Sequence, residues 1–260
     1  MIRDDLREEI TLKLDKIRGN PEAYDSQTRL VRDDLRILGD VYSFWIENPD
    51  LRKSLLNNKE PNTIMKIARK GTRNIHNAWR FLTSYGQDSD FAEVFEGVIL
   101  QGANALVNGR RFKEGEYRYR DVTLGFRNYM PPNARDVPNK VQEAIEKIRG
   151  EYKADSLGAA IYAHLAFALI QPFDEGNKRT ARLVQDRILV DAGMPPAIIP
   201  AGEGKFYFML LEKVASAYKD GDANRQSIFY NYMASKVNNG LDKILNDLNL
   251  NWTLPLNSNE

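Results

Sequence analysis

The chain has 260 residues, with 37 lysines and arginines against 36 aspartates and glutamates, for a formal net charge of +1. This balance excludes a global field that favours nucleic acid or an anionic membrane. The absence of cysteine excludes disulfides, a thiol nucleophile and Cys-ligated zinc. The N-terminus is charged from its third residue, and the longest apolar stretch, residues 157–170, is shorter than the roughly 20 residues of a membrane span. We therefore expect a cytoplasmic, soluble protein.

Apolar residues recur at spacings of three and four along most of the chain, which predicts a mainly α fold. The sequences Gly19-Asn20-Pro21 and Asn48-Pro49 end the first two helices, because a residue before proline disfavours helical geometry. A loosely ordered tail is expected over residues 251–260. In chain order, we expect helices over residues 2–18, 26–47, 61–84, 89–107, 136–152, 156–170, 176–193, 204–219 and 222–247.

Residues 114–137, EGEYRYRDVTLGFRNYMPPNARDV, interrupt this helical pattern. The segment is rich in aromatic and β-branched residues, has Gly125 near its middle and contains the pair Pro131-Pro132. This composition predicts a short β-hairpin, forming an extended flap, rather than a helix. An ordinary connecting hairpin would show the same pattern.

The stretch HLAFALIQPFDEGNKRTARLVQDRIL, residues 164–189, joins an apolar helix to a basic one. Pro172 ends the first helix, and Gly176 permits a turn before the next helix begins near Asn177. The unpaired N–H groups at the start of a helix form a cradle for anions.

Charged side chains surround this cradle. Three cations lie within five positions, and two carboxylates precede them with the oxygen ligands that Mg²⁺ accepts beside phosphates. These residues are Lys178, Arg179 and Arg182, and Asp174 and Glu175. The pattern predicts a site for a Mg²⁺–nucleotide or a polyphosphate. The alternative is a capped helix start with a solvated charged face.

The stretch resembles the signature of the Fic family. That signature is a histidine, Pro-Phe, a variable residue, an acidic residue, Gly-Asn-Gly-Arg, and a second arginine three positions on. The similarity extends to Ala163-His164, to the flap, and to LVDAGMPP after the motif, over roughly residues 89–235. The matching motif residues are Pro172, Phe173, Glu175, Gly176, Asn177, Arg179 and Arg182.

The resemblance implies a Fic-type helical core over residues 89–235. A helical N-terminal extension would cover residues 1–88, and the end of a C-terminal helix with a tail would cover residues 236–260. Members of this family typically transfer AMP from ATP to a hydroxyl group of a target protein. The implied partner is therefore a protein that carries a hydroxyl residue, and a homo-oligomer is compatible with the resemblance.

The family's residue roles can be placed on this sequence by resemblance. Glu175 would hold Mg²⁺, Gly176 and Asn177 would hold the α and β phosphates of ATP, and Arg179 and Arg182 would bind the outer phosphates. Phe173 would anchor the loop in the core. The flap would position the target segment by strand pairing. Its target-binding residues would be Tyr119, Val122, Leu124 and Phe126.

Gln171 stands where the family carries the histidine that acts as general base. A primary amide can hydrogen-bond a hydroxyl but cannot accept its proton. We therefore expect hydroxyl transfer to be weak or absent while ATP binding is retained. His164 lies roughly 10 Å away along the helix and is interpreted as a hydrogen-bonded core histidine. Gln171 has three open explanations: natural loss of activity, an altered transfer chemistry, or a substitution introduced to trap an inactive state.

Lys178 stands where AMP-transferring members carry glycine. A lysine there resembles the Doc branch, whose members use the pocket as a protein kinase, and it would add a phosphate contact. Doc members, however, keep the histidine and usually have alanine at the position of Gly176. Two alternatives to a weak AMP transferase therefore stay open. One is a Doc-like phosphotransferase, and the other is a non-catalytic nucleotide-binding interaction module.

Residues 43–48, SFWIEN, resemble the inhibitory helix of many Fic proteins: a Ser or Thr, three residues, Glu, then Gly or Asn. In those proteins the glutamate pairs with the second motif arginine and blocks productive ATP binding. The resemblance implies that Glu47 reaches Arg182. The alternative is that Glu47 is a surface residue near a helix end.

Overall fold

The computed structural model describes residues 1–20, 27–111, 117–250 and 252, and every structural statement below concerns these residues. Helices make up most of this part of the chain. They are α1 (Asp4–Arg18), α3 (Gln27–Glu47), α4 (Pro49–Leu56), α5 (Pro61–Thr83), α6 (Phe91–Val94), α7 (Gly97–Val107), α8 (Val137–Tyr152), α9 (Ser156–Ile170), α10 (Asn177–Asp191), α11 (Gly204–Lys219) and α12 (Ala223–Asp247), with 3-10 turns η1 (Ala134–Asp136) and η2 (Ala201–Glu203).

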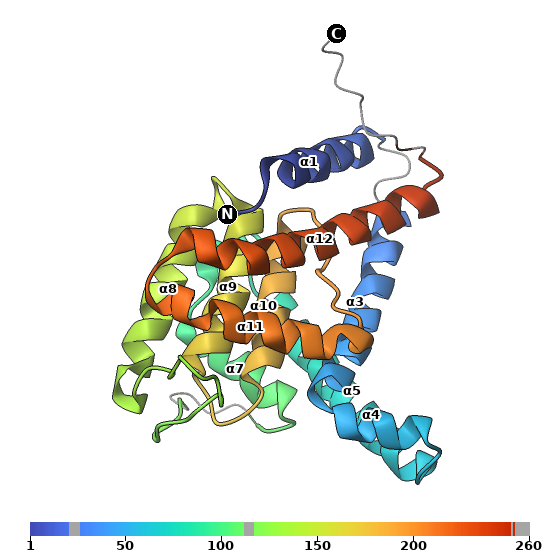
Figure 1. Ribbon diagram of the computed structural model, residues 1–260. Coiled ribbons are helices and arrows are strands. Elements are labelled where there is room, and N and C mark those ends of the chain that lie inside the picture. The colour runs from blue at the N-terminus through green and yellow to red at the C-terminus, as the bar shows by residue number, and fades with distance from the viewer. Residues whose placement is uncertain (21–26, 112–116, 251, 253–260) are drawn as a thin grey trace.

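Helix α9 is the centre of the fold. Every residue from Leu157 to Ile170 is buried, as a helix that is apolar on all sides requires. Its main neighbours are α8 and α10, with α11 and α12 also in contact, and α7 packs on α8 and α10 (Figure 1). Within the described ranges, no helix is both long and apolar enough to cross a membrane.

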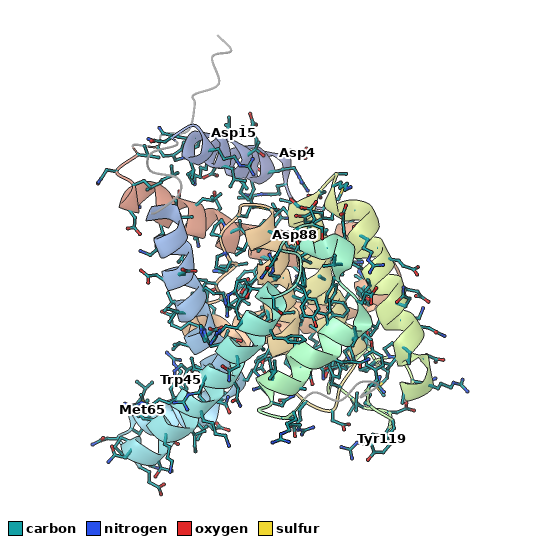
Figure 2. All side chains as sticks on the ribbon, turned by 180° about the vertical axis from the view of Figure 1, so that it is seen from behind. Asp4, Asp15, Trp45, Met65, Asp88 and Tyr119 are labelled. Atoms are coloured by element: carbon teal, nitrogen blue, oxygen red, sulfur yellow. The ribbon has the colours of Figure 1, made fainter. Side chains whose placement is uncertain are left out.

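The N-terminal helices pack on the outside of this core. Helix α1 lies along α12, and α3 contacts α5, α10, α12 and η2. Helix α4 and the adjoining end of α5 project from the body, and Figure 2 shows Met65 near the tip of this projection. Arg7 of α1 donates two hydrogen bonds to Asp155, at 2.7 and 2.9 Å, and Asp155 caps α9 by accepting from Gly158 N.

The predicted helices are found with their ends shifted by at most two residues, with one correction. The helix expected over residues 89–107 is two helices, α6 and α7. Phe95 between them is fully buried with extended backbone (φ −66°, ψ 123°), and its carbonyl accepts from Arg149 Nη2 at 2.8 Å. The apolar spacing continues through Phe95, so the spacing does not reveal the break. Helix α4, which starts at Pro49, was not predicted; proline is favoured at this first position.

The predicted β-hairpin is wrong. Residues 117–133 form no strand, and residues 114–116 of the predicted flap lie outside the described ranges. The segment bends at residues 119–120 and turns at residues 127–128, and it is held by separate contacts, mainly of Arg118, instead of a strand ladder. The guanidinium of Arg118 donates to the carbonyls of Gln171, Arg120 and Pro132. A strand needs repeated backbone pairing with a neighbour, and here the carbonyls are bound by a side chain.

Candidate functional site: an anion-binding loop between two helices

The loop between α9 and α10 is framed by two residues in left-handed backbone conformations. Gln171 ends α9 with φ 52° and ψ 62°, and Gly176 precedes α10 with φ 77° and ψ 3°. A Cβ atom on Gly176 would lie 2.8 Å from Asn108 Nδ2. Glycine is therefore required there by both conformation and space. Arg118 N donates to Pro172 O at 2.9 Å, which joins the flap segment to this loop.

Asn177 organises the loop. Its Oδ1 accepts from Phe173 N at 2.9 Å, and its Nδ2 donates to Phe173 O at 2.7 Å and to Gln171 Oε1 at 3.1 Å. Gln171 Nε2 in turn donates to Ala168 O at 2.6 Å. Both side chains are buried and both use their amide groups within the loop. The first N–H groups of α10 have no partner inside the helix, so they remain available for an anion.

Helix α7 supplies two asparagines that the sequence analysis did not single out. Asn104 Nδ2 donates to Glu175 O at 2.9 Å, and Asn108 Nδ2 reaches the same oxygen at 3.2 Å. Asn108 Oδ1 accepts from Arg179 Nη2 at 3.0 Å. These contacts fix both the turn and one arginine. Two asparagines four residues apart, at the end of a mostly apolar helix, were the available signal.

Helix α3 covers the other arginine. Arg182 donates from Nε to Ser43 Oγ at 3.0 Å and from Nη2 to Glu47 Oε1 at 2.9 Å. Burial acts to lower the pKa of Arg182, but the charge of Glu47 and the nearby Tyr207 outweigh it, so the pKa is raised. The contact between Glu47 and Arg182 that the sequence pattern implied is present. Its inhibitory role stays a prediction.

Behind Arg182 lies a buried histidine. His164 Nδ1 is 2.6 Å from Gln185 Oε1, and His164 Nε2 is 2.9 Å from the Tyr207 hydroxyl. An amide oxygen can only accept, so Nδ1 carries the proton and Nε2 accepts from Tyr207. Burial first, and then the positive charge of Arg182, lower the pKa of His164 to about 3. His164 is a hydrogen-bonded core histidine, as expected, and it supports the ring that packs 5.5 Å from the Arg182 guanidinium carbon.

The two acidic residues of the loop face solvent. The Glu175 side chain is 65% exposed and lies 3.6 Å from Arg110, and Asp174 lies 3.3 Å from Arg120. No group of three or more His, Cys, Asp or Glu side chains in the described residues is placed to hold a metal ion by itself. An exposed carboxylate beside the unpaired N–H groups that begin α10 fits Mg²⁺, which usually takes one or two carboxylates together with substrate phosphates.

Lys178 and the flap residues lie around the loop. Lys178 Nζ is 5.4 Å from the centroid of the Phe208 ring, a cation–π contact with α11. Tyr119 is 85% exposed, and Figure 2 shows it at the edge of the molecule. Val122, Leu124 and Phe126 are half-buried and alternate with exposed residues, as in a single extended chain. Arg118, which fixes this segment, was not singled out from the sequence, because a surface arginine and a buried one look alike there.

Residues 97–189 match the model of the Fic/DOC family. The "Protein adenylyltransferase Fic" of Drosophila persimilis is 33% identical over 100 residues, which are 38% of this chain and 19% of that protein. The protein of the same description from Drosophila melanogaster is 32% identical over 100 residues, 38% of this chain and 20% of that protein. The chain thus spans about a fifth of the length of these relatives.

Solved structures share the fold over nearly the whole chain. A Fic domain containing signaling protein from Bacteroides thetaiotaomicron superposes with a TM-score of 0.74 at 18% identity, over 94% of this chain and 99% of that one. A Fic family protein from Desulfovibrio desulfuricans G20 gives a TM-score of 0.64 at 20% identity, over 98% of this chain and 78% of that one. The similarity therefore includes the helices that precede and follow residues 97–189.

Proposed function

We propose that this chain, which carries a Fic/DOC family domain over residues 97–189, binds ATP with Mg²⁺ and is of the AMP-transferring class, with hydroxyl transfer weak or absent. The relatives named as protein adenylyltransferases support the class of reaction. The proposed substrate is ATP, and the proposed acceptor is a hydroxyl group of a target protein. The chain has no cysteine, and a reducing compartment such as the cytoplasm is the proposed setting.

The hydrogen bonding of Gln171 carries this proposal. Its Nε2 donates to Ala168 O and its Oε1 accepts from Asn177 Nδ2, so the side chain helps to hold the loop shape. An amide has no useful basicity near neutral pH. A general base typically raises the reaction rate by 10²–10⁴-fold, and we expect the rate of hydroxyl transfer to be lower by that factor. The anion cradle does not depend on a base at this position.

The phosphates of ATP would lie over the start of α10. The backbone N–H groups of Gly176, Asn177 and Lys178 would bind them, and Arg179 would reach an outer phosphate after leaving Asn108. Arg182 would do so after leaving Glu47. Mg²⁺, held by Glu175 and the phosphates, would neutralise part of the triphosphate charge. All of these groups lie just before α10 or in its first two turns, which supports a shared role.

The target would bind along the extended segment that contains Tyr119, Val122, Leu124 and Phe126. An unpaired extended backbone can pair with a second extended chain, and its half-buried side chains can contact that chain. Arg118 holds this segment to Gln171 and Pro172, so a target paired with it would lie beside the phosphates. Because Arg118 holds the segment there, we place the acceptor hydroxyl of the target beside Gln171 and Pro172.

A transfer assay with two labels tests the proposal. The chain with Glu47→Gly is incubated with α-labelled or γ-labelled ATP, Mg²⁺ and a lysate that supplies acceptors, with and without Gln171→His. We expect incorporation of the α label to rise at least about 100-fold after Gln171→His. Gln142→His, which adds the same side chain on the exposed surface of α8, is the matched control and should change nothing.

The other outcomes decide against the proposal in different ways. Incorporation of the γ label would favour a phosphotransferase that uses Lys178. Absence of both transfer and ATP binding, in the parent and in the Gln171→His variant, would favour a non-catalytic interaction module.

A further inference from the structure

Two charge pairs join α3 to α10. Glu47 Oε1 lies 2.9 Å from Arg182 Nη2, and Arg36 Nη1 lies 2.8 Å from Asp186 Oδ2. Residues 36, 40, 43 and 47 lie on one face of α3, and residues 182 and 186 lie one turn apart on α10. Helix α3 supplies the cation at one pair and the anion at the other. The two pairs together fix which residue of α3 faces which residue of α10.

The pair formed by Arg36 is held from several sides. Arg36 also pairs with Asp40 on its own helix, and its guanidinium carbon lies 4.9 Å from the Trp79 ring centroid on α5. The Asp40 carboxylate lies 3.5 Å from His76 Nδ1, also on α5. Groups from α3, α5 and α10 therefore meet at one buried arginine.

Asp186 is fixed as firmly as its partner. Its Oδ1 accepts from Ala197 N at 3.0 Å, which leaves Oδ2 to Arg36. The side chains of Arg36 and Asp186 are 6% and 7% exposed, against 20% for Glu47. Glu47 is the last residue of α3, where a helix is least constrained. The Arg36 pair is thus the deeper of the two, about three helical turns before Glu47.

We propose that the pair of Arg36 and Asp186 is a positioning clamp that holds α3 on α10 and thereby keeps Glu47 on Arg182. The clamp rests on the proposed function, in which Glu47 competes with the outer phosphates of ATP for Arg182. Neither clamp residue would touch ATP. Opening the clamp frees the end of α3, removes Glu47 from Arg182 and improves ATP binding without a change in any phosphate-binding residue.

The test is a double-mutant cycle on ATP affinity, measured by calorimetry. Asp186→Asn keeps the size of the side chain and the acceptor for Ala197 N but removes the charge that holds Arg36. We expect it to tighten ATP binding at least about fivefold, the lower end of typical coupling between sites. In a Glu47→Gly chain the same substitution should change the affinity less than about twofold, because no inhibitory contact remains to be released.

Asp155→Asn is the matched control. Asp155 also accepts one backbone N–H, from Gly158, and one arginine, Arg7, and its substitution changes the net charge equally. It should leave ATP affinity unchanged in both backgrounds. Arg36→Met is a second way to open the clamp and should repeat the effect of Asp186→Asn. The clamp would be overturned if Asp186→Asn changed ATP affinity equally with and without Glu47. It would also be overturned if a folded Asp186→Asn protein bound ATP as the parent does.

A second readout separates this inference from the proposed function. Amide hydrogen exchange at the end of α3, residues 43–47, should become faster after Asp186→Asn and Arg36→Met but not after Asp155→Asn. If no variant binds ATP, the proposed function fails, and faster exchange still supports the clamp. If exchange stays as slow as in the parent protein, the clamp fails whether or not ATP binds.

Discussion

The two faces of α10 hold similar side chains in unlike surroundings. Toward α7, Arg179 donates to neutral oxygens, Asn108 Oδ1 at 3.0 Å and Val107 O at 3.4 Å, and burial lowers its pKa. Toward α3, Arg182 meets the carboxylate of Glu47, and its pKa is raised. A phosphate that approaches Arg179 displaces weak neutral acceptors, whereas at Arg182 it has to displace a charge. We therefore expect competition with a bound phosphate to act at the α3 face.

The largest expected difference between the faces is in stability. Arg182→Ala leaves Glu47 without its cation in a mostly buried site, and we expect a loss of about 3 kcal/mol in the free energy of unfolding. Arg179→Ala removes only neutral hydrogen bonds and should cost about 1 kcal/mol. Urea unfolding of both variants measures the two losses. Adding Glu47→Ala to Arg182→Ala should recover part of the loss, and equal losses for the two arginines would contradict the contrast.

The α3 face should also respond to acid through His164, which lies behind Arg182. Its pKa is lowered from 6.5 to about 3 in the folded protein, so the unfolded chain takes up a proton first as the pH falls. This contribution to stability is complete above pH 6.5 and is lost as the pH falls toward about 3. At about pH 4.5 the loss should be about 2–3 kcal/mol.

Comparison with His164→Gln isolates this contribution. Burial raises the pKa of Asp186 to about 6 and outweighs Arg36 and the Ala197 N–H, which lower it. Asp186 therefore contributes stability as the pH falls from 6 to 3.8, the opposite of His164. The contribution of Asp186 is the same in the parent protein and in His164→Gln. The difference in unfolding free energy between parent and variant should therefore shrink as the pH falls. A difference that is independent of pH would mean that folding does not shift the pKa of His164.

The α7 face should be sensitive to shape rather than to charge. Gly176→Ala forces a side chain into a left-handed conformation and against Asn108, and we expect a loss of about 1–2 kcal/mol in unfolding free energy. Gly150→Ala is the matched control: a Cβ there meets nothing within 4 Å, and alanine favours the helix. It should stabilise by about 0.5–1 kcal/mol. If Gly176→Ala leaves the free energy of unfolding unchanged, the turn is not fixed by α7.

The smallest expected effect is on ATP affinity. Glu47→Gly removes the competing carboxylate and should tighten ATP binding about tenfold, or about 1.4 kcal/mol. Asn108→Ala removes a neutral partner on the other face and should change the affinity less than about twofold. Calorimetry measures both. An affinity that Glu47→Gly leaves unchanged would contradict the inhibitory role.

The parts that could be predicted from the sequence depend on neighbours along the chain. Pro172, Gly176 and the apolar run before them define the end of α9 and the start of α10. One contact between distant residues, that of Glu47 with Arg182 across 135 residues, was implied by the resemblance of residues 43–48 to an inhibitory helix. Other contacts between distant residues were missed. Arg118 meets Gln171 across 53 residues, Asn104 meets Glu175 across 71, and Arg36 meets Asp186 across 150. A single sequence does not show which polar side chains will be brought together over such separations.

The wrong hairpin has the same origin. Val122, Leu124 and Phe126 alternate with exposed residues as in a strand, but the segment has no strand partner. Whether an extended segment becomes a strand depends on a neighbouring backbone, which composition cannot supply. Here the neighbouring group is the guanidinium of Arg118. The break at Phe95 was missed for a related reason, since burial of its ring keeps the apolar spacing unchanged.

The contact of Arg7 with Asp155 has a consequence for synthesis of the chain. Helix α1 leaves the ribosome well before its partners, because Asp155 lies 148 residues after Arg7 and α12, on which α1 packs, follows later still. At about 5–20 residues per second, α1 waits roughly 10–45 s for α12 with its apolar stripe uncovered. Its first-turn aspartates and last-turn basic residues suit it to persist in water during that delay. A helix that is made early is thus among the last to find its place.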